Sequence, residues 1–342
     1  MEILPKNLGT RPRLAIEIRS EGIVAARAED ALGVLTAIAE RPLPEGAFTA
    51  SLHAGSFRAD ELVSVVRESL DAIAQRGERT RDVTLVVPDA ATRVLLLEFD
   101  ELPGKAAEIL PVVRFRLKKL VPFDPDHAMV SYQTMPSEGG IVRLLVVAMP
   151  SEVLAEYEGL IAAAGYITGA ILPSTLAALA SLDEQEAPVL MMNASHTAVT
   201  TAIVRGGTLL LHRTIELELE SREEDILAPP YRTVHEVDHM EAEVDMESHV
   251  LEAVLQDGSN AREIAQAVSV AAAYFEDTLA SSPQEVVSAG PLSAAALRSL
   301  LHRQGIESVG VRDAIGPDAF AAASGSALPR GWFAGVRGAL RN

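Results

Sequence analysis

Cysteine is absent from the 342 residues of this chain. Disulfide bonds and thiolate metal ligands are therefore excluded, which is compatible with a reducing compartment. Aromatic residues make up only 4% of the chain, whereas 48% of it is hydrophobic. We therefore expect a globular protein with a core of leucine, valine, isoleucine and alanine, and the length suits two domains or one large lobed domain.

Basic residues are scarce, with 29 Lys and Arg against 48 Asp and Glu, so the net charge is −19. This balance argues against a nucleic-acid-binding protein, which normally has a basic face. No apolar run approaches the roughly 20 residues of a membrane-spanning helix. The opening sequence MEILPKNLGTRPR also lacks the apolar core of a signal peptide. We therefore expect a soluble protein that stays in the compartment where it is made.

Two stretches of the sequence have the same pattern of three short apolar strands joined by tight turns. Turns such as RSEG and RGGT separate the strands. The six expected strands are 14–18, 23–27 and 34–38 in the first half, and 188–193, 198–204 and 209–217 in the second. Because the order of elements repeats, we predict an internal duplication, with one three-strand meander in each of two lobes.

Between the two meanders, the sequence predicts a smaller unit with the order strand–helix–strand–strand. Its strands are expected at 92–99, 128–134 and 141–149, and the apolar stripe Leu110, Val113, Leu117 and Leu120 predicts the helix. We therefore divide the chain into a first lobe (1–90 with 165–187), an inserted subdomain (91–164), a second lobe (188–328) and a tail (329–342).

The stretch 218–247 in the second lobe carries eleven acidic residues against two arginines. Within it, His235, Glu236 and His239 fit the H-E-x-x-H pattern of zinc peptidases, in which a helix holds both histidines on one face. The acidic surroundings favour a solvated loop instead, and nothing selects His249 or Glu252 as a third ligand. We therefore predict no metal site and keep a zinc peptidase as a remote alternative.

Several longer segments, in their order along the chain, resemble the PilM family of actin-like proteins of type IV pilus assembly. PRLAIEIRSEGIVAAR resembles the first phosphate hairpin of that family. VVRFRLKKLVPFDPDHAMVSYQ and LLVVAMPSEVLAEYEGLIAAAGYITGAILPSTLAAL are similar to its inserted subdomain and the exit from it. AQAVSVAAAYFEDTLASSPQEVVSAGPLSAAALRSLLHRQG and AFAAASGSAL are similar to its long helix with the adenosine loop and to its closing helix. The cytoplasmic domain of GspL, from type II secretion, is a near neighbour of the family.

The resemblance implies an α/β fold with two actin-like lobes, of the ASKHA or ribonuclease H-like class, and a strand–helix–strand–strand subdomain inserted in the first lobe. It also implies a cytoplasmic scaffold, peripherally associated with the inner membrane, in a type IV pilus or type II secretion platform, with a role in twitching motility. The implied partners are other pilus assembly proteins and the N-terminal cytoplasmic peptide of a PilN-like membrane protein. In the family, this peptide lies in a groove between the first lobe and the inserted subdomain.

Actin-like ATPases hold nucleotide phosphates between two β-hairpins, in which an acidic residue positions the metal and glycine admits phosphate to the backbone. By resemblance, the corresponding residues here are Glu17, Ser20, Asn193, Ser195 and Thr197, with Gly290 in the adenosine loop. Glu17 and Asn193 stand where aspartate is expected, and Arg19 stands where glycine is expected. We therefore expect no ATP hydrolysis and no cofactor, and keep an ATP- and Mg²⁺-binding assembly ATPase as the alternative.

The segment RFRLKK is a first candidate contact surface. Its cations are Arg114, Arg116, Lys118 and Lys119. We expect this helix to face either the partner peptide or anionic lipid headgroups, and a solvated face is the alternative.

The tail PRGWFAGVRGALRN is a second candidate contact surface. It holds Trp332, the only tryptophan, beside Phe333, and it contains no acidic residue. This composition is typical of a short interfacial anchor, such as the closing helix of FtsA. The alternative is that both rings pack onto the second lobe. Because three glycines disfavour a free helix, we expect an irregular backbone in water.

Overall fold

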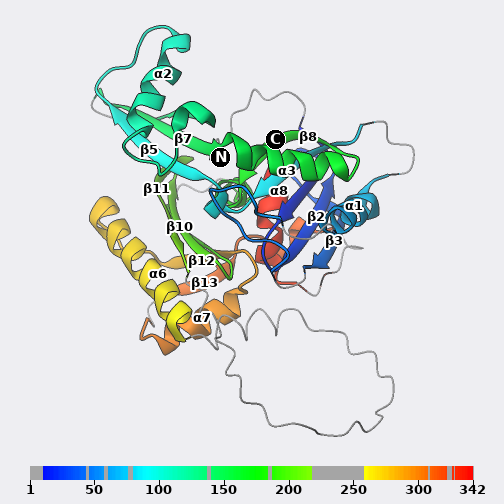
Figure 1. The fold of residues 1–342 in the computed structure, drawn as a ribbon. Coiled ribbons are helices and arrows are strands. Elements are labelled where there is room, and N and C mark those ends of the chain that lie inside the picture. The colour runs from blue at the N-terminus through cyan, green and yellow to red at the C-terminus, as the bar shows by residue number, and fades with distance from the viewer. Residues whose placement is uncertain are drawn as a thin grey trace, which may run out of the picture.

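The structure, a computed structural model, describes residues 11–43, 46–57, 61–75, 80–136, 140–183, 187–217, 258–306, 309–321, 326 and 328–341. In this part of the chain, helices connect two five-stranded sheets and one three-stranded sheet (Figure 1). The H-E-x-x-H segment with His235 and His239, and also His249 and Glu252, lie outside the described residues. Of the helices described, none is long and apolar enough to cross a membrane.

The first lobe is built on a sheet with the order β3-β2-β1-β4-β8. Its strands are β1 (Leu14–Ile18), β2 (Gly22–Ala28), β3 (Leu35–Pro42), β4 (Asp82–Val87) and β8 (Ile167–Pro173). The first three strands pair antiparallel as the predicted meander, whereas β4 runs parallel to both β1 and β8. Leu14, Ile16 and Ile18 alternate on the face of β1 that packs against α1 (Glu61–Ile73) and α3 (Ser151–Ala163). The sequence predicted a strand over these residues.

The second lobe repeats this order, with strands β11-β10-β9-β12-β13. Its elements are β9 (Val189–Ala194), β10 (Ala198–Arg205), β11 (Thr208–Glu216), α6 (Gly258–Leu279), β12 (Glu285–Ala289), α7 (Ala294–Arg303) and β13 (Gly310–Asp313). Helix α7 begins after Ser293, whose Oγ accepts a hydrogen bond from Ala296 N. Both sheets place a three-strand meander beside two parallel strands. The predicted repeat of one topology in the two lobes is therefore confirmed.

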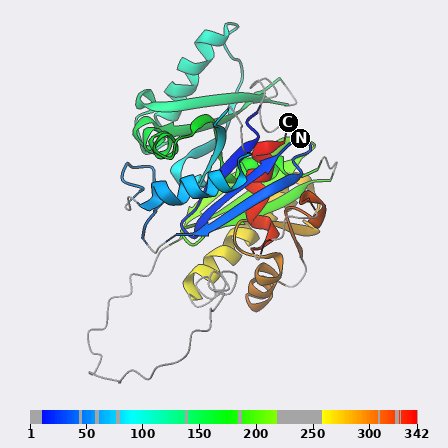
Figure 2. The ribbon, with the colours of Figure 1, turned by 90° about the vertical axis from the view of Figure 1, so that its right-hand side faces the viewer.

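The inserted subdomain has the predicted order of elements, with β5 (Arg93–Phe99), α2 (Ala106–Leu117), β6 (Ala128–Met135) and β7 (Val142–Pro150). It forms one end of the molecule, and α2 lies on its outer side, away from α6 and α7 (Figures 1 and 2). Val113 and Leu117 of α2 pack on one face of the β5-β7-β6 sheet. Helix α3, which the predicted boundary at 164 assigns to this subdomain, packs instead in the first-lobe core against α1 and β8.

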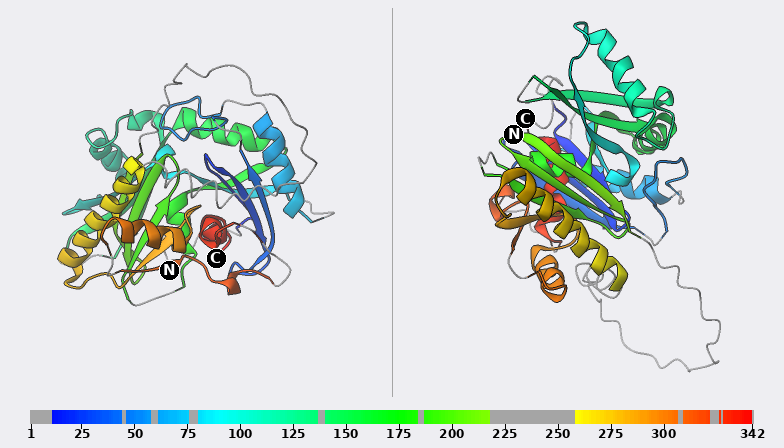
Figure 3. Two further views of the ribbon diagram at one scale, coloured as in Figure 1. Left: turned by 90° about the horizontal axis from the view of Figure 1, so that it is seen from below. Right: turned by 90° about the vertical axis from the view of Figure 1, so that its left-hand side faces the viewer.

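The central core lies between the two large sheets, where α4 (Ser174–Ala180) packs against α8 (Ala334–Leu340) (Figure 3). Helix α8 also contacts β1, β2 and β4 of the first lobe. The short helix η4 (Arg330–Phe333) leads into α8 and contacts β12 and β2. The C-terminal segment therefore fills the junction of the two lobes.

The structure contradicts the exposed anchor and the irregular backbone predicted for the tail, and supports the alternative in which both rings pack inside the protein. Trp332 is 1% exposed and Phe333 is fully buried, and the backbone around them is helical. The glycines, which predicted an irregular backbone, permit close packing instead. A Cβ atom at Gly338 would lie 1.8 Å from the Ala177 carbonyl oxygen, and one at Gly335 would lie 2.4 Å from Glu17 Oε2. The tail is thus neither an exposed anchor nor packed on the second lobe alone.

Candidate functional site

The two hairpins predicted to hold phosphates face each other at the junction of the lobes. In the β1–β2 turn, Arg19 and Gly22 exchange backbone hydrogen bonds of 3.0 and 3.3 Å. In the β9–β10 turn, the Ser195 amide donates a 2.8 Å backbone hydrogen bond. Glu21 joins the two turns, because its Oε1 accepts a 2.5 Å hydrogen bond from His196 N.

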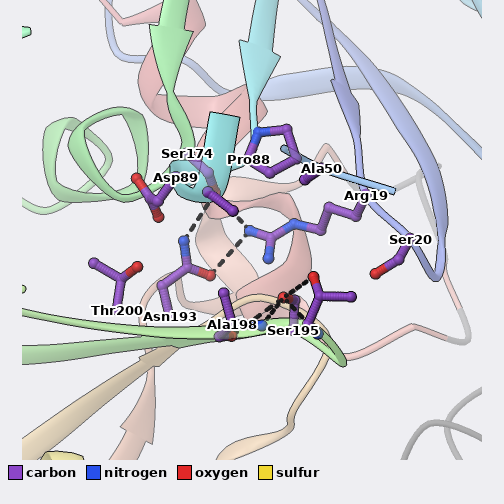
Figure 4. Close-up of a pocket in the computed structure, with 12 residues that line it drawn as sticks. Arg19, Ser20, Ala50, Pro88, Asp89, Ser174, Asn193, Ser195, Ala198 and Thr200 are labelled. Atoms are coloured by element: carbon purple, nitrogen blue, oxygen red, sulfur yellow. Dashed lines mark hydrogen bonds between the residues drawn. The ribbon is translucent and has the colours of Figure 1, made fainter. Parts of the chain in front are cut away.

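The Arg19 side chain extends between the hairpins and is only 4% exposed (Figure 4). Its Nε donates to Glu17 Oε1 at 2.8 Å. Its Nη2 donates to Ser174 Oγ at 2.7 Å and to Asn193 Oδ1 at 3.0 Å. Ser174 Oγ in turn donates to Glu17 Oε1 at 2.6 Å. One guanidinium therefore joins β1, the first residue of α4 and the second-lobe strand β9.

A second part of the network continues from Asn193 toward the inserted subdomain. Asn193 Nδ2 donates to Ser174 Oγ at 2.8 Å and to Thr175 Oγ1 at 3.0 Å. Thr175 Oγ1 then donates to Asp89 Oδ2 at 2.5 Å. His212 Nε2 of β11 lies 3.7 Å from Asp89 Oδ1, which is an ion-pair distance. Asn193 and His212 thus connect the second lobe to buried groups of the first.

The two buried carboxyl groups of this network have opposite pKa shifts. Burial raises the pKa of Glu17, and Arg19 and Ser174 offset only part of this effect. Burial alone would also raise the pKa of Asp89, but His212 and Thr175 hold it below its usual value. Glu17 Oε2 has no hydrogen-bond partner within the described part of the chain. Glu17 is therefore the group whose charge depends most on Arg19.

The network leaves little free space between the hairpins. The cavity there has a volume of about 20 Å³ and is lined by Arg19, Ser20, Asp89, Ser174 and Asn193, among others. A single water molecule needs roughly 10–15 Å³ measured in this way. Across the residues that the structure describes, no cluster of His, Asp and Glu side chains could hold a metal ion. The side chains of the Arg19 network therefore fill most of the space between the hairpins in this structure.

Gly290 of the second lobe packs against the network. It has a φ of 86°, a conformation that favours glycine. A Cβ atom here would lie 2.6 Å from the Ala194 carbonyl oxygen, 2.7 Å from Asn193 Oδ1 and 3.0 Å from Arg19 Nη1. The residue predicted for the adenosine loop therefore packs directly on the Arg19–Asn193 contact.

The structure brings Glu17, Asn193 and Gly290 together, whereas the other predicted nucleotide residues lie at the rim. Ser20 Oγ donates to Glu21 Oε2 at 3.0 Å, and Ser195 and Thr197 share a 3.4 Å contact within their own hairpin. These three hydroxyl groups line the cavity but do not take part in the Arg19 network.

Sequence reasoning missed four members of the network: Asp89, Ser174, Thr175 and His212. A signal exists for the first three, because polar residues directly follow the buried strands of VTLVVPD and AILPST. The ends of parallel strands β4 and β8 meet at one edge of the sheet, so these residues come together. His212 carries no such signal, because its partner depends on how the two lobes pack.

The predicted partner-binding residues separate into internal and surface groups. Arg114 donates to the carbonyl oxygens of Pro125 and Ala128, so it holds the turn before β6. Lys118 pairs with Asp126 at 2.6 Å. Arg116 near the end of α2 and Lys119 in the turn that follows it are exposed. Trp332 and Phe333 are buried and cannot meet a partner in this state, so their predicted contact role is wrong for this structure.

Comparison with solved structures shows where this fold occurs. A chain of the "PilM-PilN type IV pilus biogenesis complex" superposes with a TM-score of 0.71 at 18% sequence identity. The match covers 97% of this chain and 100% of the other. No protein-family model and no curated protein sequence matches this chain.

Two further solved structures are more distant. The cytoplasmic domain of EpsL from Vibrio cholerae has a TM-score of 0.40 at 12% identity, with 59% of this chain and 70% of that chain covered. The ethanolamine utilization protein EutJ from Carboxydothermus hydrogenoformans has a TM-score of 0.44 at 11% identity, with 98% and 92% covered. These two scores are too low to support an inference.

The match with a TM-score of 0.71 over 97% of this chain confirms the predicted resemblance to PilM for the fold. The chain has the two-lobed actin-like architecture, with a strand–helix–strand–strand subdomain inserted in its first lobe.

Proposed function

We propose that this chain is a non-catalytic actin-like scaffold of a type IV pilus or type II secretion platform, at the cytoplasmic face of the inner membrane. It binds the N-terminal cytoplasmic peptide of a PilN-like membrane protein and does not hydrolyse ATP. The observation that carries this proposal is the Arg19 guanidinium, which fills the space between the two phosphate hairpins and contacts Glu17 and Asn193.

A nucleotide would have to displace this guanidinium. Glu17, which is fully buried, would then lose its counter-charge. Breaking a buried ion pair by removing one partner typically costs about 3–5 kcal/mol. Asn193 also lacks the carboxylate that Mg²⁺ prefers as a ligand. Binding of Mg-ATP would therefore have to supply this free energy before any catalysis began.

The proposed partner follows from the similarity over the whole chain to a chain of a PilM–PilN complex. On the present chain, the junction between the inserted subdomain and the first lobe offers an apolar contact. Met129 on β6 is 58% exposed, and its cross-strand neighbour Met149 packs in the first-lobe core. Strand β6 also contacts α3. An extended apolar peptide at this junction would therefore touch both parts.

Isothermal titration with a synthetic peptide of the first residues of the PilN-like partner tests the scaffold role. We expect saturable binding that Met129→Glu weakens by at least about tenfold, because burying an unpaired carboxylate at an apolar contact costs more than the about 1.4 kcal/mol that tenfold represents. Leu32→Glu is the matched control, since Leu32 is 65% exposed in the β2–β3 turn and should leave binding unchanged. Equal loss in both variants, or no binding at all, would contradict the proposed site.

Titration with Mg-ATP tests the nucleotide part of the proposal separately. We expect no heat of binding at millimolar nucleotide and no release of phosphate above the rate without protein. Micromolar affinity with measurable turnover would show that Arg19 does not block the cleft, and would favour the assembly ATPase instead.

A further inference from the structure

The outer surface of α2 exposes an aromatic side chain between cations. Phe115 is 71% exposed and Leu120 is 47% exposed, and Arg116 and Lys119 are exposed beside them. The backbone hydrogen bonds Lys119 N to Arg116 O and Leu120 N to Leu117 O continue the helical turn beyond α2. Residues three and four apart therefore lie side by side on this surface. We call Phe115, Arg116, Lys119 and Leu120 the α2 tip.

Other side chains of this segment are engaged within the inserted subdomain. Val113 and Leu117 are fully buried against the β5-β7-β6 sheet. Arg114 and Lys118, the other two cations of RFRLKK, are bound to the turn before β6, although Lys118 is also exposed to solvent. The α2 tip is thus a solvent-exposed surface that lies beside these anchored residues.

The charges around the α2 tip leave it basic. Lys118 pairs with Asp126 at 2.6 Å, and Asp124 pairs with His127 at 2.9 Å. Glu108, one turn and more away on α2, lies 3.4 Å from Lys105. Lysines therefore neutralise Asp126 and Glu108, whereas Arg116 and Lys119 add positive charge. This contrasts with the net charge of −19 of the whole chain.

We propose that the α2 tip rests on an anionic lipid surface, with Phe115 in the interfacial region and Arg116 and Lys119 against the headgroups. Charge complementarity favours this occupant, because a basic point on an acidic protein is the part that an anionic bilayer attracts. One exposed aromatic ring flanked by cations also fits the composition of interfacial anchors. The proposal rests on the proposed function in one respect, since a membrane-anchored peptide partner brings the inserted subdomain to the bilayer.

The test places a fluorescent reporter at the α2 tip and does not need the partner. A full-length chain with an N-terminal hexahistidine tag and the substitution Phe115→Trp is bound to vesicles that contain a nickel-chelating lipid and brominated phosphatidylcholine. Trp332 is 1% exposed and supplies a constant background. We expect the bromolipid to quench the introduced tryptophan when the vesicles also contain 30% phosphatidylglycerol, and much less without it. Leu32→Trp, at the 65% exposed Leu32 of the first lobe, is the matched control and should not be quenched.

Charge reversal then tests the cations. In the Phe115→Trp background, Arg116→Glu with Lys119→Glu should lower partitioning of untagged protein onto phosphatidylglycerol vesicles by at least about 30-fold, since loss of each basic residue near the surface costs about fivefold and the added carboxylates are repelled as well. Quenching that is equal at positions 115 and 32, or that does not depend on phosphatidylglycerol, would overturn the proposal. So would a shift of the introduced tryptophan on addition of the soluble partner peptide without lipid, which would assign the α2 tip to a protein contact. Failure of peptide binding in titration would leave these vesicle results unaffected, so the two proposals fail separately.

Discussion

This chain has two basic, aromatic segments of similar composition, of which one lies at the surface and the other is buried. RFRLKK, at the end of α2, presents Phe115 and three of its cations to solvent. The tail buries Trp332 and Phe333 between the lobes. It also uses its arginines internally, since Arg337 Nη1 donates to Ser181 O at 2.8 Å. Composition alone therefore does not distinguish a surface contact from a core helix.

Glycine spacing explains the difference. The tail places Gly331, Gly335 and Gly338 on a helix, and at each position a Cβ atom would lie within 3 Å of another part of the chain. Small residues at such spacing let a helix backbone approach a neighbour closely, and this gain outweighs the weaker helix propensity of glycine. The α2 helix has no glycine between Ala106 and Leu117, and bulky side chains cover its outer side. For the tail, the aromatic and basic composition predicts an exposed anchor, whereas the glycine spacing predicts close packing. The structure agrees with the glycine spacing.

The largest expected effect compares one aromatic ring from each segment. Trp332→Ala should lower the free energy of unfolding by about 3–5 kcal/mol, because it leaves a large cavity in the central core. Phe115→Ala should change it by less than about 0.5 kcal/mol, because the ring is exposed. Urea denaturation measures both changes, provided that the variants and the wild type have the same m-value. A small loss for Trp332→Ala would mean that the tail is not docked in solution.

Arg19 provides the next comparison, between a buried cation and the exposed cations of α2. Arg19→Ala should lower the free energy of unfolding by about 3 kcal/mol, because Glu17 becomes a buried carboxylate without a partner. The double variant Arg19→Ala with Glu17→Gln should recover part of this loss, since it removes the uncompensated charge. A double-mutant cycle with no coupling would contradict the network as described.

The loss in Arg19→Ala should also depend on pH. Burial already raises the pKa of Glu17 in the folded protein, and removal of Arg19 takes away a group that lowers it. The folded variant then binds a proton more tightly than the unfolded chain does. Its stability is therefore greatest below the unfolded pKa of the carboxyl group and falls as pH rises through the folded pKa. Denaturation at pH 5 and pH 8 should show a larger deficit relative to wild type at pH 8, and an equal deficit at both would exclude Glu17 as the cause.

Much of the fold is predictable from the sequence because the strands are short, apolar and bounded by clear turns. The two meanders and the order β5, α2, β6, β7 follow from such local patterns. The candidate site is less predictable, because its members come from distant segments. Glu17 and Asn193 were identified by resemblance, whereas Asp89 and Ser174 meet them only through the parallel pairing of β4 and β8. The inward position of Arg19 depends on the approach of the second lobe, which no local pattern encodes.

Gly338→Ala isolates the close approach of α8 to α4. A Cβ atom would lie 1.8 Å from the Ala177 carbonyl oxygen and 2.8 Å from Ser181 N, so backbone must shift. Overpacking of this kind typically costs about 1–3 kcal/mol. Gly206→Ala is a control in the β10–β11 turn, where a Cβ atom meets nothing within 4 Å but φ is 53°. It should cost about 1–2 kcal/mol from backbone strain alone. Equal losses for the two variants would show that the contact with Ala177 does not determine the cost.

The smallest expected effect compares two arginines with the same side chain and different surroundings. Arg337 is 7% exposed, and burial lowers its pKa. Arg337→Gln should lower the free energy of unfolding by about 1–2 kcal/mol, because the hydrogen bond to Ser181 and the packing of the aliphatic stem are lost. Arg116→Gln should change it by less than about 0.5 kcal/mol, because an exposed cation contributes little to stability. Raising the salt concentration should leave the difference between the two variants unchanged, since screening acts mainly on exposed charges. A difference that disappears in high salt would mean that Arg337 acts through long-range charge and not through its buried contacts with α4.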